Sequence, residues 1–376
     1  MAARGQSPSP SIHRTRRKAT FSRAARRARI DSYLVTRPAD VMYLTGFTGD
    51  DSVLLLHRRG AVLVTDGRYD EQARAECPDV GLVVRTGAMV EAIGQTARNL
   101  RLRRAGLQGG HVTMSLRDSL ARNGAFRRLL VPEEVVGGLR IAKDEGEVAV
   151  IEKAVRVAER AFREMLRLGL KGWIGRSERQ LAAELDYRMK QAGAQGPAFE
   201  SIVAVGPHSS LPHYRPGDTR LRAGGFALVD WGARVGGYCS DLTRVVLAGR
   251  IPPRLAEIYQ VVLRAQSAGI AAIRGGIAAA SADKAARSVI EAAGYGKQFV
   301  HGLGHGIGLD IHEGPSLSRT AKGRLRPGMV VTVEPGIYLP GFGGVRIEDD
   351  VLVTPAGRRR LTTLPKEPRA MTLRST

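Results

Sequence analysis

The stretch FALVDWGARVGGYCSDLTRVV, residues 226–246, sets two aspartates into a hydrophobic β pattern. Asp230 lies within the first apolar run, and Asp241 stands just before the second. Folding the chain back around Val235 and Gly236 makes the two aspartates direct cross-strand neighbours, with Cβ atoms about 5 Å apart. Because valine disfavours a positive φ, a longer or bulged loop is the alternative at this turn. Two carboxylates that face each other in an apolar sheet repel unless a shared proton or a divalent cation offsets them.

The same pattern recurs downstream with two glutamates. Glu334 ends the hydrophobic run VVTVE, and Glu348 lies in the run GVRIEDDVLV. Between the two acidic pairs, the stretch HGLGHGIGLDIHE (301–313) holds three of the chain's eight histidines. Four carboxylates with one imidazole make a hard, oxygen-rich ligand set, which suits two divalent ions bridged by carboxylates. Manganese, cobalt, iron(II) and zinc all fit such a set, whereas a cysteine-rich structural zinc site does not.

Length and pattern indicate two domains. At 376 residues the chain is too long for one small domain. Short strands and helices alternate up to about Leu130, which predicts a compact α/β domain. Capping boxes at Asp144 and Ser177 then open long helices between β runs, which predicts an antiparallel sheet backed by helices. The expected division is a disordered basic tail over 1–18, a first domain over 19–133, a linker over 134–143, a second domain over 144–366 and a carboxy-terminal tail over 367–376.

The pattern also predicts individual elements. A basic amphipathic helix is expected from Ala19 to Ile30. The β runs expected in the second domain are Ser201–Val205, Phe226–Trp231, Tyr238–Leu247, Met329–Glu334 and Gly344–Val353.

Composition excludes several classes of protein. With 43% hydrophobic and 25% charged residues the chain is globular, and no window approaches eighteen uninterrupted apolar residues, so no membrane span is expected. Cys77 and Cys239 are too far apart for a CxxC motif and fit a reducing compartment. We therefore expect a cytoplasmic protein. Import into an organelle is the alternative, because the start of the chain is rich in Arg and Ser and lacks acidic residues.

The formal net charge of +22 raises the question of a nucleic-acid partner. Nine positive charges precede the first acidic residue, Asp31, and the others are spread along the chain. Aromatic residues, which stack on bases, make up only 5%. The charge therefore indicates a solvated basic surface, and nucleic acid is not the expected partner.

Four motifs, in this order, resemble those of the pita-bread metallopeptidases: LVDWGARVGGYCSDLTR, HGLGHGIGLDIHE, VVTVEPGIYLPG and GGVRIEDDVLV. This superfamily includes methionine aminopeptidase, Xaa-Pro aminopeptidase, prolidase and creatinase. The first domain resembles their creatinase-like amino-terminal domain through YLTGFTG (43–49) and TDGRYDEQA (65–73). The resemblance implies an α/β amino-terminal domain followed by an α+β pita-bread catalytic domain, with a curved antiparallel sheet backed by helices.

The resemblance also implies a metal centre. It places the five metal ligands at Asp230, Asp241, His305, Glu334 and Glu348. Asp241 and Glu348 would bridge both ions. Two divalent metal ions per subunit are expected, with Mn²⁺ as the first candidate and Co²⁺, Zn²⁺ or Fe²⁺ as alternatives.

Further site residues follow from the same resemblance. His213 and His312 match two catalytic histidines, suited to stabilising a tetrahedral intermediate and moving a proton, and Glu334 is placed to accept a proton as well as to ligate. The residues expected in the substrate pocket or as partners that orient the ligands are His301, Arg346 and Tyr338. The residues expected to be structural, solvated or in turns are His13, His57, His111, His208, Asp349 and Asp350.

Within the superfamily, the choice falls on peptidases that cleave before proline. Methionine aminopeptidases lack the first domain, and creatinase lacks the full ligand set. The expected function is that of a dinuclear-metal exopeptidase hydrolysing the bond between an N-terminal residue and proline, an Xaa-Pro aminopeptidase. A prolidase restricted to Xaa-Pro dipeptides is the alternative, and a non-catalytic binding protein with a basic nucleic-acid-associating surface is a more distant one. Proline-containing peptides are the expected substrates, and a homodimer is the expected assembly.

Overall fold

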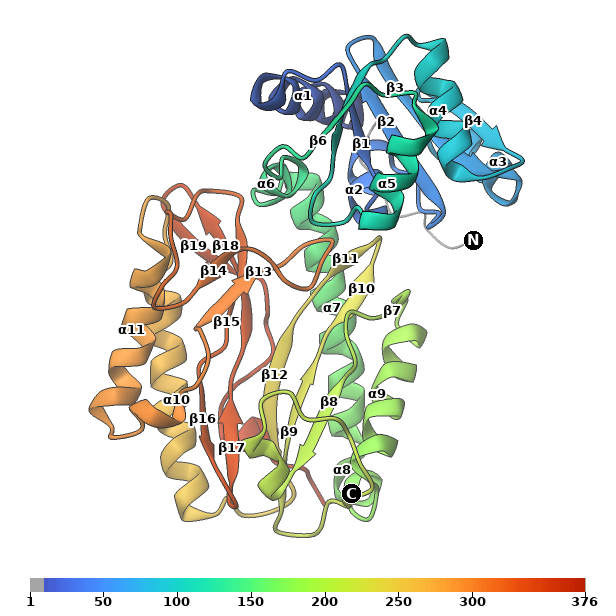
Figure 1. The fold of residues 1–376 in the computed structure, drawn as a ribbon. Coiled ribbons are helices and arrows are strands. Elements are labelled where there is room, and N and C mark those ends of the chain that lie inside the picture. Colours follow the sequence, from blue (N-terminus) through green and yellow to red (C-terminus); the bar gives the residue numbers. More distant parts are fainter. Residues whose placement is uncertain (1–9, 376) are drawn as a thin grey trace. The chain divides into compact units, whose positions relative to one another are not determined.

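The computed structural model describes residues 10–375, which fold into two compact units. The first unit ends at Arg140 and the second begins at Ile141 (Figure 1). Among the described residues, no helix combines the length and the apolar character that crossing a membrane requires. Cys77 and Cys239 are both buried free thiols.

The first unit is an α/β domain built on a six-stranded mixed sheet with the strand order β4-β3-β2-β1-β5-β6. β1 pairs in parallel with β5 and antiparallel with β2, and its four residues are all buried. The predicted α/β domain is confirmed. Its elements are α1 (Pro10–Ala28), β1 (Ser32–Val35), α2 (Pro38–Thr45), β2 (Ser52–His57), β3 (Gly60–Asp66), the 3₁₀ turn η1 (Gly67–Tyr69), α3 (Asp70–Glu76), β4 (Gly81–Arg85), α4 (Met89–Asn99), β5 (Arg104–Leu107), α5 (Met114–Asn123), β6 (Arg128–Leu130) and α6 (Val136–Arg140).

Helix α1 begins at Pro10, nine residues before the expected start at Ala19. The part of the predicted disordered tail that the structure describes, residues 10–18, is therefore helical, and residues 1–9 lie outside the described residues. Polar side chains dock this first part of the helix. The Arg17 guanidinium donates to the Leu44 carbonyl oxygen at 2.9 Å, and His13 Nδ1 lies 2.9 Å from the Tyr43 carbonyl oxygen. The hydrophobic pattern missed this docking because it is made by buried cations and carbonyl groups.

The second unit places helices on both sides of its antiparallel strands (Figure 1). Its elements are α7 (Glu145–Arg167), α8 (Gly169–Trp173), α9 (Glu178–Gln191), β7 (Gly196–Pro197), β8 (Ile202–Val205), η2 (Gly206–Ser210), β9 (Phe226–Trp231), β10 (Ala233–Val235), β11 (Tyr238–Cys239), β12 (Leu242–Leu247), α10 (Pro253–Ala272), α11 (Ala279–Ala292), η3 (Gly296–Gln298), β13 (Gly304–Gly306), β14 (Glu313–Leu317), β15 (Val330–Val333), β16 (Gly336–Leu339), β17 (Gly343–Arg346), β18 (Asp349–Thr354), β19 (Gly357–Arg360) and η4 (Pro368–Met371). The predicted antiparallel sheet backed by helices is confirmed, as are both capping boxes, at Asp144 and Ser177.

The sheet β12-β9-β8 is apolar on both faces. Val203, Val229 and Val246 pack with α7 and α9 in one hydrophobic core. Ala204 and Leu228 face the other way and pack with α10 and α11 in a second core. Because both faces are covered, a charged side chain on these strands is withdrawn from water.

The hairpin of residues 226–246 turns one residue later than expected. Gly236 and Gly237 occupy the turn with φ of 54° and 80°, which glycine adopts without strain, and Val235 pairs with Tyr238. Asp230 consequently lies opposite Thr243 and not opposite Asp241. The predicted direct pairing of the two aspartates is wrong by two residues, but the period of two still places Asp241 on the face that carries Asp230.

The glycines of this turn give a prediction on stability. Gly237→Val should lower the free energy of unfolding by about 1–2 kcal/mol, because a β-branched residue is strained at φ of 80°. Gly357→Val is the matched control, since Gly357 does not have a left-handed φ and a Cβ added to it would meet no other atom within 4 Å. Calorimetric melting should show a lower Tm for the first variant only, and equal Tm values would contradict the turn assignment.

Candidate active site

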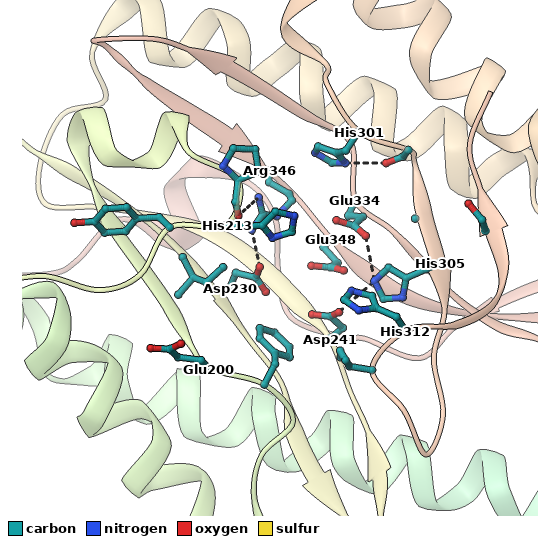
Figure 2. A pocket seen from close by; sticks show the side chains of 18 of the residues that line it. Glu200, His213, Asp230, Asp241, His301, His305, His312, Glu334, Arg346 and Glu348 are labelled. Carbon is teal, nitrogen blue, oxygen red and sulfur yellow. Dashed lines mark hydrogen bonds and ion pairs between the residues drawn. The ribbon is translucent and has the colours of Figure 1, made fainter. Parts of the chain in front are cut away.

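One pocket of the second unit collects nine of the ten site residues predicted from the sequence. Tyr338 is the exception and lies behind the pocket wall, against His301 and Arg346. In Figure 2 five side chains gather around a common centre: Asp230, Asp241, His305, Glu334 and Glu348. The predicted residues that line the pocket are His213, Asp230, Asp241, His301, His305, His312, Glu334, Arg346 and Glu348.

Two of the acidic residues stand at interruptions of the β structure. Asp241 lies between β11 and β12, and Glu348 lies between β17 and β18, within runs that the sequence predicts as continuous strands. Each is at most 5% exposed. Both side chains nevertheless line the pocket, on the same side as Asp230.

The histidine of the cluster presents a lone pair to carboxylates. His305 Nδ1 lies 3.1 Å from the Gly306 carbonyl oxygen, which can only accept, so Nδ1 carries the proton and Nε2 does not. Nε2 lies 3.6 Å from Asp241 Oδ2 and 3.4 Å from Glu334 Oε1. Unprotonated nitrogen and carboxylate oxygen repel each other at these distances. A cation between them removes the repulsion, and one ligand atom each of Asp241, His305 and Glu348 lies within 4.8 Å of the others.

The electrostatics of the cluster also favour a cation, because without one the carboxylates have to take up protons. Burial raises the pKa of Asp230, Asp241 and Glu348, and the neighbouring carboxylates raise the last two further, well above their ordinary range. Burial also raises the pKa of Glu334 to about 7 and lowers that of His305 to about 4. Asp230 Oδ1 and Glu348 Oε1 are buried without any hydrogen-bond partner. Such orphaned oxygens are the donors that a hard divalent cation takes.

Arg346 connects the carboxylates to one another. Its Nη2 donates to Asp230 Oδ2 at 2.5 Å, and its Nε donates to Thr243 Oγ1 at 3.1 Å. Thr243 in turn donates its hydroxyl proton to Glu348 Oε2 at 2.6 Å. One guanidinium therefore fixes the orientation of Asp230 directly and of Glu348 through the threonine.

The same guanidinium begins a chain of hydrogen bonds with fixed direction. Arg346 Nη1 donates to the Tyr338 hydroxyl oxygen at 2.8 Å, and Tyr338 donates to His301 Nε2 at 2.8 Å. His301 must accept at Nε2 because its Nδ1 donates to the Gly302 carbonyl oxygen at 2.8 Å. Burial lowers the pKa of His301 to about 4, which keeps this imidazole neutral.

The loop that carries His213 is tied to one buried carboxylate. Glu178, fully buried at the start of α9, accepts from the backbone N–H groups of Val205 and Gly217 at 2.8 and 3.0 Å. It also accepts from the Tyr214 hydroxyl at 2.8 Å and lies 2.8 Å from His208 Nδ1. Both ends of the segment 206–217 are thereby fixed, while the His213 side chain stays exposed on the pocket wall.

Asp349 and Asp350 are not turn or surface residues, contrary to expectation. Both are fully buried on β18, where Thr332 and Val333 of β15 pair with them. Asp350 Oδ2 accepts from the Asp241 backbone N–H at 3.1 Å. With Glu348 they form a run of three acidic residues, which resembles a solvated turn in sequence. Only the strand pairing reveals that the chain continues into the sheet.

A second guanidinium neutralises Asp349 beneath the pocket. Arg244 is fully buried and donates to Asp349 Oδ1 at 2.8 Å and to the Glu348 carbonyl oxygen at 2.6 Å. Lys366 Nζ lies 2.9 Å from Asp349 Oδ2, and these cations lower the pKa of Asp349 although burial opposes them. The backbone that presents Glu348 is thus held by charge pairs.

Sequence reasoning missed several residues of the site. Thr243 and Thr332, whose hydroxyls donate to Glu348 and Glu334, look like ordinary strand threonines in sequence. The signal that could have found them is position, because each is two residues from a predicted ligand and so shares its strand face. Glu200 and Arg215, 3.9 Å apart, also line the pocket and are exposed. They lie outside any motif that carried the resemblance.

The predicted histidines outside the site have other surroundings. His13 is buried in the first unit, and His208 is half-buried and stacks on Tyr214 with ring centroids 4.5 Å apart. His312 lies in the pocket at a ring distance of 4.3 Å from His305.

Comparison with known proteins agrees with this geometry. Residues 149–355 match Metallopeptidase family M24, and residues 17–141 match the Creatinase/Prolidase N-terminal domain. The chain is 35% identical to an Xaa-Pro dipeptidase of Pyrococcus furiosus over 340 residues, which are 90% of this chain and 95% of that protein.

Two solved structures share the fold over nearly their whole length. An Xaa-Pro dipeptidase from Bacillus anthracis superimposes with a TM-score of 0.89 at 36% identity, covering 96% of this chain and 99% of that one. An X-Pro aminopeptidase from Thermotoga maritima superimposes with a TM-score of 0.86 at 36% identity, covering 92% and 99%. The expected pita-bread fold and the metallopeptidase class are confirmed: the chain belongs to metallopeptidase family M24 and carries the creatinase/prolidase amino-terminal domain.

Proposed function

We propose that this protein is an Xaa-Pro dipeptidase, which hydrolyses the bond before proline in dipeptides. The observation that carries the metal-dependent hydrolysis is the cluster in which the unprotonated His305 Nε2 faces the oxygens of Asp241 and Glu334. The preference for proline and for dipeptides is supported by the Xaa-Pro dipeptidases of Pyrococcus furiosus and Bacillus anthracis, to which the chain is similar over most of its length. The expected aminopeptidase activity on longer peptides is the second candidate, favoured by the similarity to the Thermotoga maritima X-Pro aminopeptidase.

Two divalent cations fit the ligand set of Asp230, Asp241, His305, Glu334 and Glu348. The orphaned oxygens of Asp230 and Glu348 and the His305 lone pair are the donors they would take. When bound there, divalent cations supply Lewis acidity and lower the pKa of water to near neutrality. Manganese remains the first candidate, with Co²⁺, Zn²⁺ and Fe²⁺ as alternatives.

The protein's own groups then divide the work on the peptide. Glu334, which lines the pocket beside the other ligand carboxylates, is suited to accept the proton of the attacking water. His213 and His312 come from different segments of the pocket wall and are both exposed to the pocket. One donates a hydrogen bond to the developing oxyanion and the other transfers a proton to the leaving proline nitrogen.

Charges at the rim support a dipeptide as the substrate. A dipeptide brings an ammonium group and a carboxylate close to the scissile bond. The exposed pair Glu200 and Arg215, which lines the pocket, offers one partner for each. Arg215 is 88% exposed along its side chain and 3.9 Å from Glu200, so a substrate carboxylate can displace that weak contact.

Assembly and location stay predictions. A homodimer is expected from the resemblance, and the cytoplasm from the few cysteines.

The proposed activity predicts hydrolysis of Ala-Pro faster than that of Ala-Pro-Ala by the manganese-loaded protein, and none after chelation. Arg215→Gln should raise KM for the dipeptide severalfold and leave KM for the tripeptide nearly unchanged, because only the dipeptide carries its carboxylate on proline. Arg264→Gln, which changes an exposed arginine of α10, is the control. A tripeptide cleaved faster would favour the aminopeptidase, and no cleavage of either peptide with metal bound would exclude both.

Variants of the ligands separate metal binding from catalysis. Asp241→Asn and Glu348→Gln should abolish both activity and metal content, because each is expected to serve two cations. His312→Gln should lower kcat about 100-fold and keep the metal content of the parent, as general acid–base groups contribute on the order of 10²–10⁴. Metal analysis by emission spectrometry beside the activity assay checks both, and loss of metal in His312→Gln would contradict its assignment.

The raised pKa values predict how the effect of metal depends on pH. Without metal, the pKa of Glu334 is about 7 in the folded protein, above its ordinary value of 4.5. Between these two pH values the folded protein binds more protons than the unfolded chain, so its free energy of unfolding falls as pH rises. A bound cation needs these carboxylates ionised and cancels that loss. Manganese should therefore raise Tm more at pH 8 than at pH 5.5 in scanning calorimetry, and an equal rise at both pH values would argue against protonated carboxylates in the metal-free site.

A further inference from the structure

Eight exposed arginines gather at one edge of the six-stranded sheet of the first unit, and the proposed peptidase activity uses none of them. We call them the arginine edge: Arg29, Arg58, Arg59, Arg101, Arg103, Arg104, Arg127 and Arg128. In sequence they are scattered over a hundred residues. The fold brings them together.

The strand register places these arginines at the same edge. β1, β5 and β6 run parallel, with Ser32 beside Ala105 and Arg104 beside Arg128, so the residues that precede the three strands meet. β2 runs antiparallel to β1 with His57 opposite Ser32, and the turn from β2 to β3 therefore reaches the same edge. Five adjacent strands contribute to it.

Almost no negative charge balances this edge. Its segments 29–31, 57–60, 100–104 and 124–128 contain one acidic residue, Asp31. That carboxylate accepts from the backbone N–H groups of Arg103 and Arg104 and lies 3.9 Å from Arg104 Nε. Within residues 10–375, the other seven arginines form no ion pair with an acidic side chain.

Two of these arginines have a left-handed backbone conformation, which costs free energy in residues other than glycine. Arg29 and Arg101 have φ of 52° and 58°, and they are the non-glycine residues with left-handed backbone in the described part of the chain. Glycine or asparagine would relieve this strain. Strained positions concentrate where function demands a side chain, and here the retained side chain is a guanidinium in both cases.

We propose that the arginine edge binds the phosphate backbone of a nucleic-acid duplex without reading its bases. Guanidinium groups match phosphate oxygens with two parallel hydrogen bonds. Five strands spaced about 4.8 Å apart span about 19 Å, the length of helix axis over which one strand of a duplex carries about six phosphates.

The chemistry of the edge distinguishes it from two other anionic partners. Its segments hold no Trp or Tyr on which unpaired bases could stack, so a single strand is a poorer match. The exposed large hydrophobic residues of the first unit, Ile12, Met114 and Val131, lie outside those segments. The edge therefore lacks the apolar anchors with which proteins bind a lipid surface.

Fluorescence anisotropy of labelled 20-base-pair RNA and DNA duplexes of the same sequence, titrated with the full-length protein between 50 and 200 mM NaCl, tests the proposal. Engagement of about six phosphates predicts a slope of log K against log salt of about −5, a loss of about a thousandfold in affinity over this range. Both duplexes bind if the protein contacts only the phosphate backbone. The ratio of their dissociation constants then shows whether the protein prefers RNA or DNA.

Matched variants separate the edge from overall charge. The triple variant Arg58→Gln, Arg103→Gln and Arg127→Gln should make the salt slope shallower by about three, since each lost phosphate contact removes about one. The control Arg74→Gln, Arg117→Gln and Arg156→Gln removes the same charge at exposed positions outside the edge and should leave the slope unchanged. Should the first variant melt below the parent, Arg59→Gln with Arg128→Gln replaces it.

Three outcomes would overturn the proposal. The first is absence of duplex binding at 50 mM NaCl. The second is an equal loss of affinity in the edge variant and the control, which would assign binding to net charge. The third is edge-dependent binding to phosphatidylglycerol vesicles without binding to either duplex, which would make the partner a lipid surface.

Discussion

The mutual repulsion of four carboxylates, of which three are buried and Glu334 is partly buried, is the constraint on which the catalytic unit depends. Four acidic side chains point into one pocket (Figure 2), and their pKa values are raised: Asp230, Asp241, Glu334 and Glu348. The fold therefore keeps these groups close together although their negative charges repel one another. Such a cluster persists only if the surrounding structure supplies enough fixed order to hold it. The two cores packed on either face of the β12-β9-β8 sheet supply that order.

Two buried arginines apply the same physics in different ways. Arg346 donates hydrogen bonds to Asp230 and Thr243. It lies inside the site, where its positive charge offsets part of the negative charge of the carboxylates. Arg244 lies below, against Asp349 and the carbonyl oxygens of the chain, and holds the backbone. The site thus separates orientation of side chains from support of the strands. Loss of Arg346 would leave Asp230 without its charged partner, which is the more damaging way to break an ion pair. Loss of Arg244 would still leave Lys366 beside Asp349.

Much of this could be predicted from sequence, because the signals were local. Acidic residues inside apolar runs revealed Asp230, Asp241, Glu334 and Glu348, and the capping boxes at Asp144 and Ser177 revealed where helices begin. The catalytic roles of these residues stay predictions.

What the sequence could not supply depends on contacts between distant segments. The two-residue error at the Gly236–Gly237 turn arose because either of two turns fits the pattern, and only the positive φ of both glycines decides between them. The burial of Asp349 and Asp350 depends on pairing with β15. Glu178 stands at the start of a helix, where a carboxylate normally faces water, and its four partners come from the segment 205–217.

The hydrogen-bond chain from Arg346 through Tyr338 and His301 to Gly302 has a consequence for proton traffic. Each donor in it is committed in one direction, and the chain ends at a carbonyl oxygen that cannot release a proton onward. The chain therefore provides no path for proton transfer on that side of the pocket. Protons therefore enter or leave the reacting centre from the opposite side, where the pocket is exposed to water. The rate of hydrolysis should then depend on buffer concentration and show a solvent isotope effect.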